Sequence, residues 1–196
     1  MTLVKERVGH ATARRAMIDS QLRVSGVNDP AILAAFASVA REDFVPAGAR
    51  AIAYMDRAVP LGDGTVLAPA LTHGQMLTVA EVSPADHVLV IGQPGTYLAA
   101  LVAQLGAKVS VAAPDADWGF ASPYSLVLID GAIAVAPPAL VAVLADHGRV
   151  VTGLVERGVM RLATGRRVLG DLVLTMLAEA DFAALPAFAA KKSWSF

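Results

Sequence analysis

Short apolar runs recur along the C-terminal two thirds of the chain, and four of them have the composition of buried strands. A strand covered on both faces of a parallel sheet is apolar throughout, whereas a half-exposed strand alternates apolar and polar residues. The four runs cover residues 87–91, 108–112, 125–129 and 148–152. Residues 159–177 alternate instead and predict two antiparallel strands that turn near Gly165. The pattern therefore predicts an α/β fold, with a mostly parallel sheet and an antiparallel C-terminal hairpin.

Helical periodicity dominates the first third of the chain. An apolar stripe predicts a helix over residues 12–25, which Gly26 ends. Asp29 can cap a second helix, whose first turn holds Pro30. Further helices are expected at 72–82, from 97 to near 106 and from 137 through 144, with a short strand at 66–67. We expect residues 1–82 to form a helical and loop segment packed on a core of residues 83–196, with one structural domain overall.

The first apolar run leads into a glycine-bearing turn, Gly92-Gln93-Pro94-Gly95-Thr96, and then into a helix. Strand, glycine turn and helix form the front half of a βαβ unit, where α/β proteins hold nucleotide-like ligands. The turn therefore supplies three candidate ligand-binding residues, Gly92, Gln93 and Gly95. Asp130 and Gly131 end another buried strand, and ligands bind at such strand ends. Asp130 is equally consistent with an acid that caps a helix or orders a loop.

Composition narrows the class of protein. Hydrophobic residues make up 56% of the 196 residues and charged residues 17%, which excludes an intrinsically disordered chain. A net charge of −1 gives no basis for binding nucleic acid or an anionic membrane. We identify no signal peptide and no membrane span, and the absence of cysteine agrees with a cytoplasmic protein. The high apolar content indicates either a core rich in small residues or an apolar interface in a homo-oligomer.

The four histidines, His10, His73, His87 and His147, lack the spacing of metal ligands, so no metal site is predicted. We interpret His73 as a partly exposed helix residue, with a substrate contact as the alternative. The C-terminal tail from Phe182 ends in Trp194 and Phe196 and is expected to pack on the body of the domain.

Several short motifs follow one another in the N-terminal third: Arg15-Ala16-Met17, Gln21-Leu22, Arg41-Glu42-Asp43-Phe44-Val45-Pro46, Ala53-Tyr54 and Pro60-Leu61-Gly62. Later segments extend the set: the turn within residues 88–97, Pro123-Tyr124-Ser125 through Gly131-Ala132, Pro137-Pro138-Ala139-Leu140 and Gly148-Arg149-Val150-Val151. Together they cover residues 12–154 and resemble the protein-L-isoaspartate O-methyltransferase family. The resemblance implies a Rossmann-like doubly wound methyltransferase sheet with a helical N-terminal extension. It also implies S-adenosylmethionine as cofactor and an isoaspartyl carboxylate of a protein or peptide as methyl acceptor.

Two stretches depart from the family pattern at positions that the resemblance assigns to the site. Ala68 stands where the family has a serine beside the reacting carboxylate, and the nearest hydroxyls belong to Thr65 and Thr72. In the cofactor turn, Val90 replaces an acid, and Pro94 and Thr96 replace glycines. Proline fixes φ and lacks an N–H group, so the turn offers fewer donors to a ligand.

The connection after the second apolar run is also short. The family has a helix and a third strand here, but residues 113–122 leave room only for a loop or one helical turn. The third strand is therefore predicted to be missing. Asp115 or Asp117 then either replaces the family's ribose-binding acid or is a solvated loop acid.

Two functions remain open at this point. The first is a divergent S-adenosylmethionine-dependent protein carboxyl methyltransferase. The second is a catalytically inactive methyltransferase-like domain with a degraded cofactor site, which acts as an interaction or structural module. A carboxylate is already nucleophilic at neutral pH, so the chemistry depends on positioning and exclusion of water rather than on a strong base. Fold similarity alone does not choose between the two functions.

Overall fold

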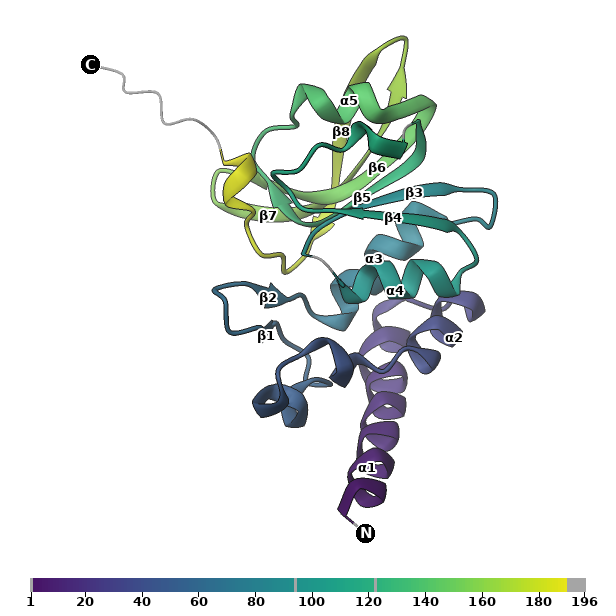
Figure 1. Ribbon diagram of the computed structural model, residues 1–196, viewed down its shortest axis with the longest axis vertical. Coiled ribbons are helices and arrows are strands. Elements are labelled where there is room, and N and C mark those ends of the chain that lie inside the picture. Colours follow the sequence, from purple (N-terminus) through teal and green to yellow (C-terminus); the bar gives the residue numbers. More distant parts are fainter. Residues whose placement is uncertain (1, 94, 122, 190–196) are drawn as a thin grey trace, which may run out of the picture.

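A six-stranded sheet forms the centre of the computed structural model, which describes residues 2–93, 95–121 and 123–189 (Figure 1). Its spatial order is β4-β3-β5-β6-β7-β8. The strands are β3 (His87–Ile91), β4 (Lys108–Ala112), β5 (Tyr124–Ile133), β6 (Leu144–Glu156), β7 (Val159–Val168) and β8 (Asp171–Glu179). β3 to β6 run parallel, and β7 and β8 are antiparallel. The predicted fold class is confirmed, including the missing third strand, because β4 is an edge of the sheet.

The predicted turn near Gly165 is wrong. Gly165 lies inside β7, paired with Val150 on one side and Leu174 on the other. The chain turns instead at Leu169 and Gly170, which both have positive φ. A Cβ at position 165 would lie 2.6 Å from the carbonyl oxygen of Val173, so this glycine serves close strand approach rather than a turn.

Within the residues that the structure describes, five α-helices accompany the sheet: α1 (Thr2–Met17), α2 (Pro30–Ser38), α3 (Ala70–Ala80), α4 (Tyr97–Gln104) and α5 (Pro138–Val143). The first predicted helix begins earlier than expected and continues through a π-helical turn (Ile18–Leu22) and a 3-10 turn (Arg23–Ser25). Gly26 ends it at a φ of 90°, and Asp29 caps α2 by accepting hydrogen bonds from the backbone of Ala31 and Ile32. Both signals had been predicted. α3 begins two residues earlier than predicted, with Pro69 at its N-cap position. It also ends two residues earlier, because Glu81 takes a left-handed conformation at the C-cap.

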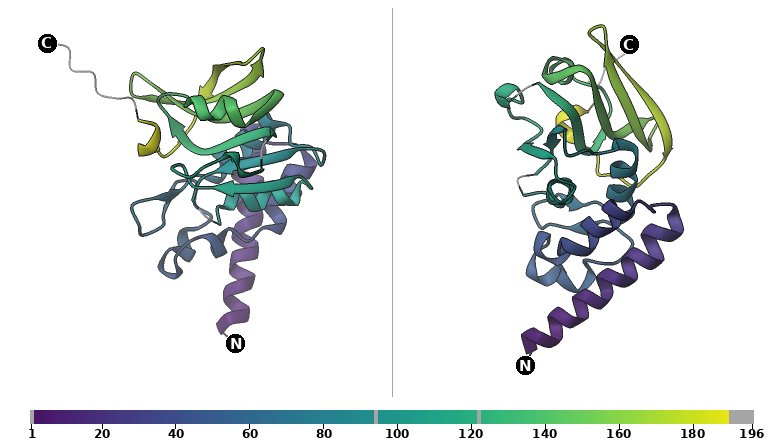
Figure 2. Two further views of the ribbon diagram at one scale, coloured as in Figure 1. Left: turned by 45° about the horizontal axis from the view of Figure 1, so that its top comes forward. Right: turned by 90° about the vertical axis from the view of Figure 1, so that its right-hand side faces the viewer.

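The helices divide between the two faces of the sheet (Figures 1 and 2). α3 and α4 pack on one face with α2 and α1 beyond them, and α5 covers the other. Alternate residues of β3 serve the two layers: Val88 and Val90 join the core under α3 and α4, whereas Leu89 and Ile91 join the core under α5. The first core also includes Leu22 and Phe36 from the N-terminal segment. The proposed boundary near residue 82 therefore crosses a shared hydrophobic core.

The segment after β8 returns to the carboxyl end of β5. The backbone N–H of Ala132 donates to the carbonyl of Ala183 at 2.7 Å, and Leu185 N–H donates to the carbonyl of Ala132 at 2.9 Å. Phe182 and Phe188 are buried, which confirms that this part of the tail packs on the domain; Trp194 and Phe196 lie outside the described residues. A short pair of strands, β1 (Val59–Pro60) and β2 (Val66–Leu67), stands beside this region. Within the described ranges, none of the helices has the length and apolar character needed to span a bilayer.

Candidate functional site

A cavity of about 470 Å³ lies at the carboxyl ends of β3 and β5, where the sheet order changes direction. Open α/β sheets bind ligands at this switch point, and the volume is within the roughly 300–1,000 Å³ typical of small-molecule sites. We call it the switch-point cavity. Its lining comes from the turn after β3, the loop between β1 and β2 together with β2 itself, the returning segment 183–187 and four single residues: Phe44, Tyr97, Pro114 and Asp130.

Most of the predicted ligand-binding residues meet in this cavity. Gly92, Gln93, Gly95 and Asp130 all line it, as does Thr96. A Cβ at Gly92 would lie 3.1 Å from the Cβ of Asp130, so the glycine permits the two strand ends to approach closely. Gly131 is not among the lining residues, since Leu185 packs against its Cα.

Asp130 is held from two sides. His73 Nε2 lies 2.8 Å from Oδ1, and Thr96 Oγ1 donates to Oδ2 at 2.5 Å. Burial alone would raise the pKa of Asp130, but the charge and hydrogen bond of His73, the hydrogen bond of Thr96 and the charge of Arg41 outweigh it and lower that pKa. The side chain is 13% exposed. The cavity therefore contains a fixed, ionised carboxylate.

The interpretation of His73 as a partly exposed helix residue is wrong. Its side chain is fully buried and lies against the ring of Tyr97, with centroids 5.8 Å apart. The sequence contained a signal for this burial: His73 shares helical spacing with Met76, Leu77 and Ala80, which form the buried stripe of α3. A histidine on such a stripe requires a buried partner, and the strand-end acid Asp130 is that partner.

The two threonines nearest Ala68 have different surroundings. Thr65 lines the switch-point cavity, and its hydroxyl and backbone N–H both donate to Oδ1 of Asp63. Thr72 is buried and donates its hydroxyl to the carbonyl of Asp181 at 2.9 Å. Ala68 itself is buried and is not among the lining residues. Of Thr65, Ala68 and Thr72, only Thr65 lines the cavity.

The predicted acids after β4 are separate from this group. Asp115 and Asp117 are exposed and border a different hollow, of about 450 Å³, between the loop and α5. Asp117 accepts a hydrogen bond from the backbone of Gly119 at 2.9 Å, which gives it a loop-ordering role. Trp118 is buried against Phe188 in the core under α5. Pro114 is the lining residue that this loop contributes to the switch-point cavity.

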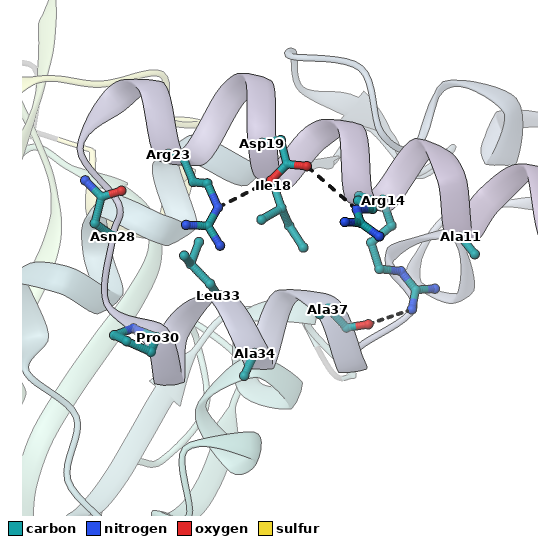
Figure 3. A pocket seen from close by; sticks show the side chains of 11 residues that line it. Ala11, Arg14, Ile18, Asp19, Arg23, Asn28, Pro30, Leu33, Ala34 and Ala37 are labelled. Carbon is teal, nitrogen blue, oxygen red and sulfur yellow. Dashed lines mark hydrogen bonds and ion pairs between the residues drawn. The ribbon is translucent and has the colours of Figure 1, made fainter.

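A larger hollow, the α1–α2 groove, measures about 560 Å³ and lies away from the strand ends (Figure 3). Its charged side chains are largely paired with groups of the chain itself. Arg14 donates to the carbonyl of Ala37 at 3.0 Å and to the hydroxyl of Tyr54 at 2.7 Å. Arg23 lies 3.3 Å from Asp19. These pairings satisfy the arginines, so the groove is the weaker candidate for a ligand site.

No cluster of three or more potential metal-binding side chains occurs in the part of the chain that the structure describes. The lining of the switch-point cavity is acidic. Its described lining includes two carboxylates, Asp63 and Asp130, and lacks lysine, arginine and histidine. Such a lining favours an organic ligand that carries positive charge.

Comparison with known proteins gives a consistent family. Residues 12–113 match the model of the protein-L-isoaspartate(D-aspartate) O-methyltransferase family. The chain is 31% identical to a protein-L-isoaspartate O-methyltransferase from Koribacter versatilis, over 94% of this chain and 96% of the relative. A protein of the same name from Methanoregula boonei is 30% identical, over 82% of each chain.

Solved structures agree at the level of the fold. One, described as a protein-L-isoaspartate O-methyltransferase from Plasmodium falciparum in complex with S-adenosyl-L-homocysteine, matches with a TM-score of 0.71 and 15% identity. The alignment covers 91% of this chain and 98% of that one. A second structure named protein-L-isoaspartate O-methyltransferase matches with a TM-score of 0.74 and 16% identity, over 90% of this chain and 67% of that one.

Proposed function

Because the chain belongs to the protein-L-isoaspartate(D-aspartate) O-methyltransferase family, we propose that it transfers a methyl group from S-adenosylmethionine to an isoaspartyl carboxylate of a protein or peptide. The observation that carries the proposal is the switch-point cavity, where the predicted turn residues and Asp130 meet. We also propose a cytoplasmic location, which the absence of cysteine favours.

The residues present suit the cofactor. S-adenosylmethionine supplies a methyl group activated by a positively charged sulfur. The described lining of the cavity offers carboxylates without a competing cationic side chain. Gly92, Gln93 and Gly95 would bind it through backbone groups at the turn, where Gly95 has a φ of 75°. The Plasmodium falciparum structure of the same fold contains S-adenosyl-L-homocysteine, which is the demethylated form of this cofactor.

Thr65 is our candidate for the hydroxyl beside the methyl acceptor. It faces the cavity from the loop between β1 and β2, three residues before the position that the resemblance assigns to a serine. Phe44 and Leu61 supply apolar lining next to this loop, and such lining excludes water from a methyl transfer. The departures at Thr96 and Ala68 are accommodated without filling the cavity. No observation favours the inactive alternative.

The proposal is tested with a peptide containing one isoaspartyl residue, labelled S-adenosylmethionine and a matched aspartyl peptide as control. We expect label in the isoaspartyl peptide only. Thermal unfolding should also shift, since a ligand at about 100 times its Kd stabilises a protein by about 2.7 kcal/mol. A thermal shift without methyl transfer would contradict the catalytic part of the proposal, and the absence of both would contradict all of it.

A further inference from the structure

The side chain of Asp130 is held in one orientation by hydrogen bonds to both of its carboxylate oxygens. The carboxylate extends from β5 just after the residues that pair with β3, beside Gly92, and both of its oxygens accept hydrogen bonds inside the protein. His73, on α3, contacts Oδ1, and Thr96, the N-cap residue of α4, donates to Oδ2. The charge therefore stays at one point, with little freedom to rotate.

The surrounding groups keep the carboxylate charged. His73 contacts it directly, and Arg41 exerts an attractive charge from the 3-10 turn Arg41–Phe44. Both lie behind Asp130: His73 and Arg41 are fully buried, and neither is among the residues that line the cavity. The His73 hydrogen bond and the charge of Arg41 thus stabilise the anion from inside the protein, and the cavity side is left to a ligand.

The neighbouring strand offers no carboxylate of its own. Val90 of β3 is fully buried in the core under α3 and α4, and Ile91 pairs in register with Ile129 of β5. Of these two strands, β5 is therefore the one that presents a negative charge to the switch point. The other acid of the lining, Asp63, is exposed on a loop, where water and salt screen it.

We propose that Asp130, positioned by His73 and Thr96, selects the cofactor by its sulfonium charge, so that the cavity distinguishes S-adenosylmethionine from S-adenosylhomocysteine. The two molecules share the adenosine, the amino group and the carboxylate, and they differ in the methyl group and the charge on sulfur. A buried carboxylate interacts strongly with a nearby cation and weakly with a neutral thioether. Methyl transfer removes that charge, and the same contact then favours release of the product. This inference rests on the proposed function.

The test compares the affinities of both ligands for purified full-length variants by isothermal titration calorimetry. Asp130→Asn keeps the shape of the side chain and removes its charge. We expect it to weaken S-adenosylmethionine binding by at least about tenfold and S-adenosylhomocysteine binding by no more than about twofold. The control Asp56→Asn removes an exposed charge that does not line the cavity, and its ratio of the two affinities should stay within about twofold of wild type.

Thr96 is tested as a positioning residue with a conservative pair. Thr96→Val removes the hydroxyl that holds Oδ2, and Thr96→Ser retains it. We expect the ratio of the two affinities to fall in the valine variant and to return in the serine variant. A purely structural role would lower both affinities together and leave their ratio unchanged.

Several results would overturn the inference. Equal losses for both ligands in Asp130→Asn would assign the carboxylate to a group that the two ligands share. Unchanged affinities would remove it from the site. Circular dichroism checks the fold, and Asp130→Ser, which also fits beside Gly92, replaces the asparagine variant if that one is unfolded. If the wild-type protein binds neither ligand, the proposed function is overturned as well. If the wild-type protein binds S-adenosylmethionine and methylates the peptide, a failure of the Asp130→Asn test overturns this inference alone.

Discussion

Nη2 of Arg41 donates a 2.6 Å hydrogen bond to the carbonyl oxygen of Ala68. The same guanidinium donates through Nε to the carbonyl of Ala53 at 2.7 Å, and it lies 5.1 Å from the ring centroid of Tyr97. Arg41 is fully buried, so it ties two loops to α4 from inside the protein. The loop that leads from the switch-point cavity into α3 therefore depends on one side chain of the N-terminal segment.

Arg41→Lys should destabilise the protein strongly. Lysine is a flexible point charge and cannot reproduce the planar fork that serves both carbonyls. We expect a loss of about 3 kcal/mol in the free energy of unfolding, because a buried charge and a buried carbonyl lose their partners. Urea denaturation measures the effect. The control Arg50→Lys changes an exposed arginine and should alter stability by no more than about 0.5 kcal/mol. Equal losses in the two variants would contradict the role assigned to Arg41.

Thr65→Val should lower methyl transfer without weakening cofactor binding. The change keeps the branched shape and removes the hydroxyl of a residue that lines the switch-point cavity, a hydroxyl that donates to Oδ1 of Asp63. We expect kcat/KM for an isoaspartyl peptide to fall about tenfold, which corresponds to about 1.4 kcal/mol of transition-state stabilisation. The matched variant Thr72→Val removes a hydroxyl that bonds to the carbonyl of Asp181 and should lower the melting temperature instead. A variant Thr65→Val with full activity would exclude this hydroxyl from the site.

The strand pattern was predictable because buried parallel strands leave a direct record in the sequence. The bounds of β3 and β4 agree with the predicted ranges residue for residue. The turn between β7 and β8 was mispredicted because a glycine inside a strand and a glycine in a turn look alike from sequence. Gly165 lies in the strand for close packing, whereas Leu169, an improbable residue for positive φ, takes part in the turn.

The site was only partly predictable for a similar reason. Gly92 follows β3 directly, and Asp130 follows the part of β5 that pairs with β3, so both positions could be located from the apolar runs. The sequence placed the end of this strand at Asp130 and Gly131, but β5 continues to Ile133. The contact between His73 and Asp130 joins residues 57 positions apart and depends on how α3 packs on the sheet. The returning segment 183–187 closes the cavity through backbone hydrogen bonds at Ala132, and backbone pairing of this kind has no side-chain signature.

Gly153→Ala should destabilise the attachment of the returning segment. A Cβ at position 153 would lie 2.7 Å from Cγ of Phe182 and 2.9 Å from Cα of Ala132, and the second of these is backbone that cannot turn away. We expect a loss of about 2 kcal/mol, as for other overpacked sites. Gly48→Ala is the matched control, since nothing lies within 4 Å of its Cβ. Urea denaturation of the two variants should separate them, and equal stability would show that Phe182 moves aside freely.

Asp86 links the start of β3 to β5 and β6. Its Oδ2 accepts hydrogen bonds from Ser83 N–H and from Arg149 Nη2, both at 2.8 Å, and Oδ1 accepts one from Ser125 Oγ at 2.7 Å. Burial alone would raise the pKa of Asp86, but the hydrogen bonds and the charge of Arg149 outweigh it and lower that pKa. The folded state therefore favours the ionised carboxylate more than the unfolded state does.

Asp86→Asn should cost stability in a pH-dependent manner. A carboxylate whose pKa is lower in the folded than in the unfolded state stabilises the protein above the unfolded pKa, about 3.9 for aspartate, and that contribution disappears as pH falls through the folded pKa. We expect the variant to be about 3 kcal/mol less stable at pH 7, because it leaves Arg149 without its charge partner. The gap should narrow below about pH 4 as the wild-type carboxylate gains its proton. Urea denaturation of both proteins between pH 7 and pH 3 measures the gap, with Asp56→Asn as the control at an exposed position. A gap that widens on acidification would mean that Asp86 is held in its protonated form, which is incompatible with the three donors around it.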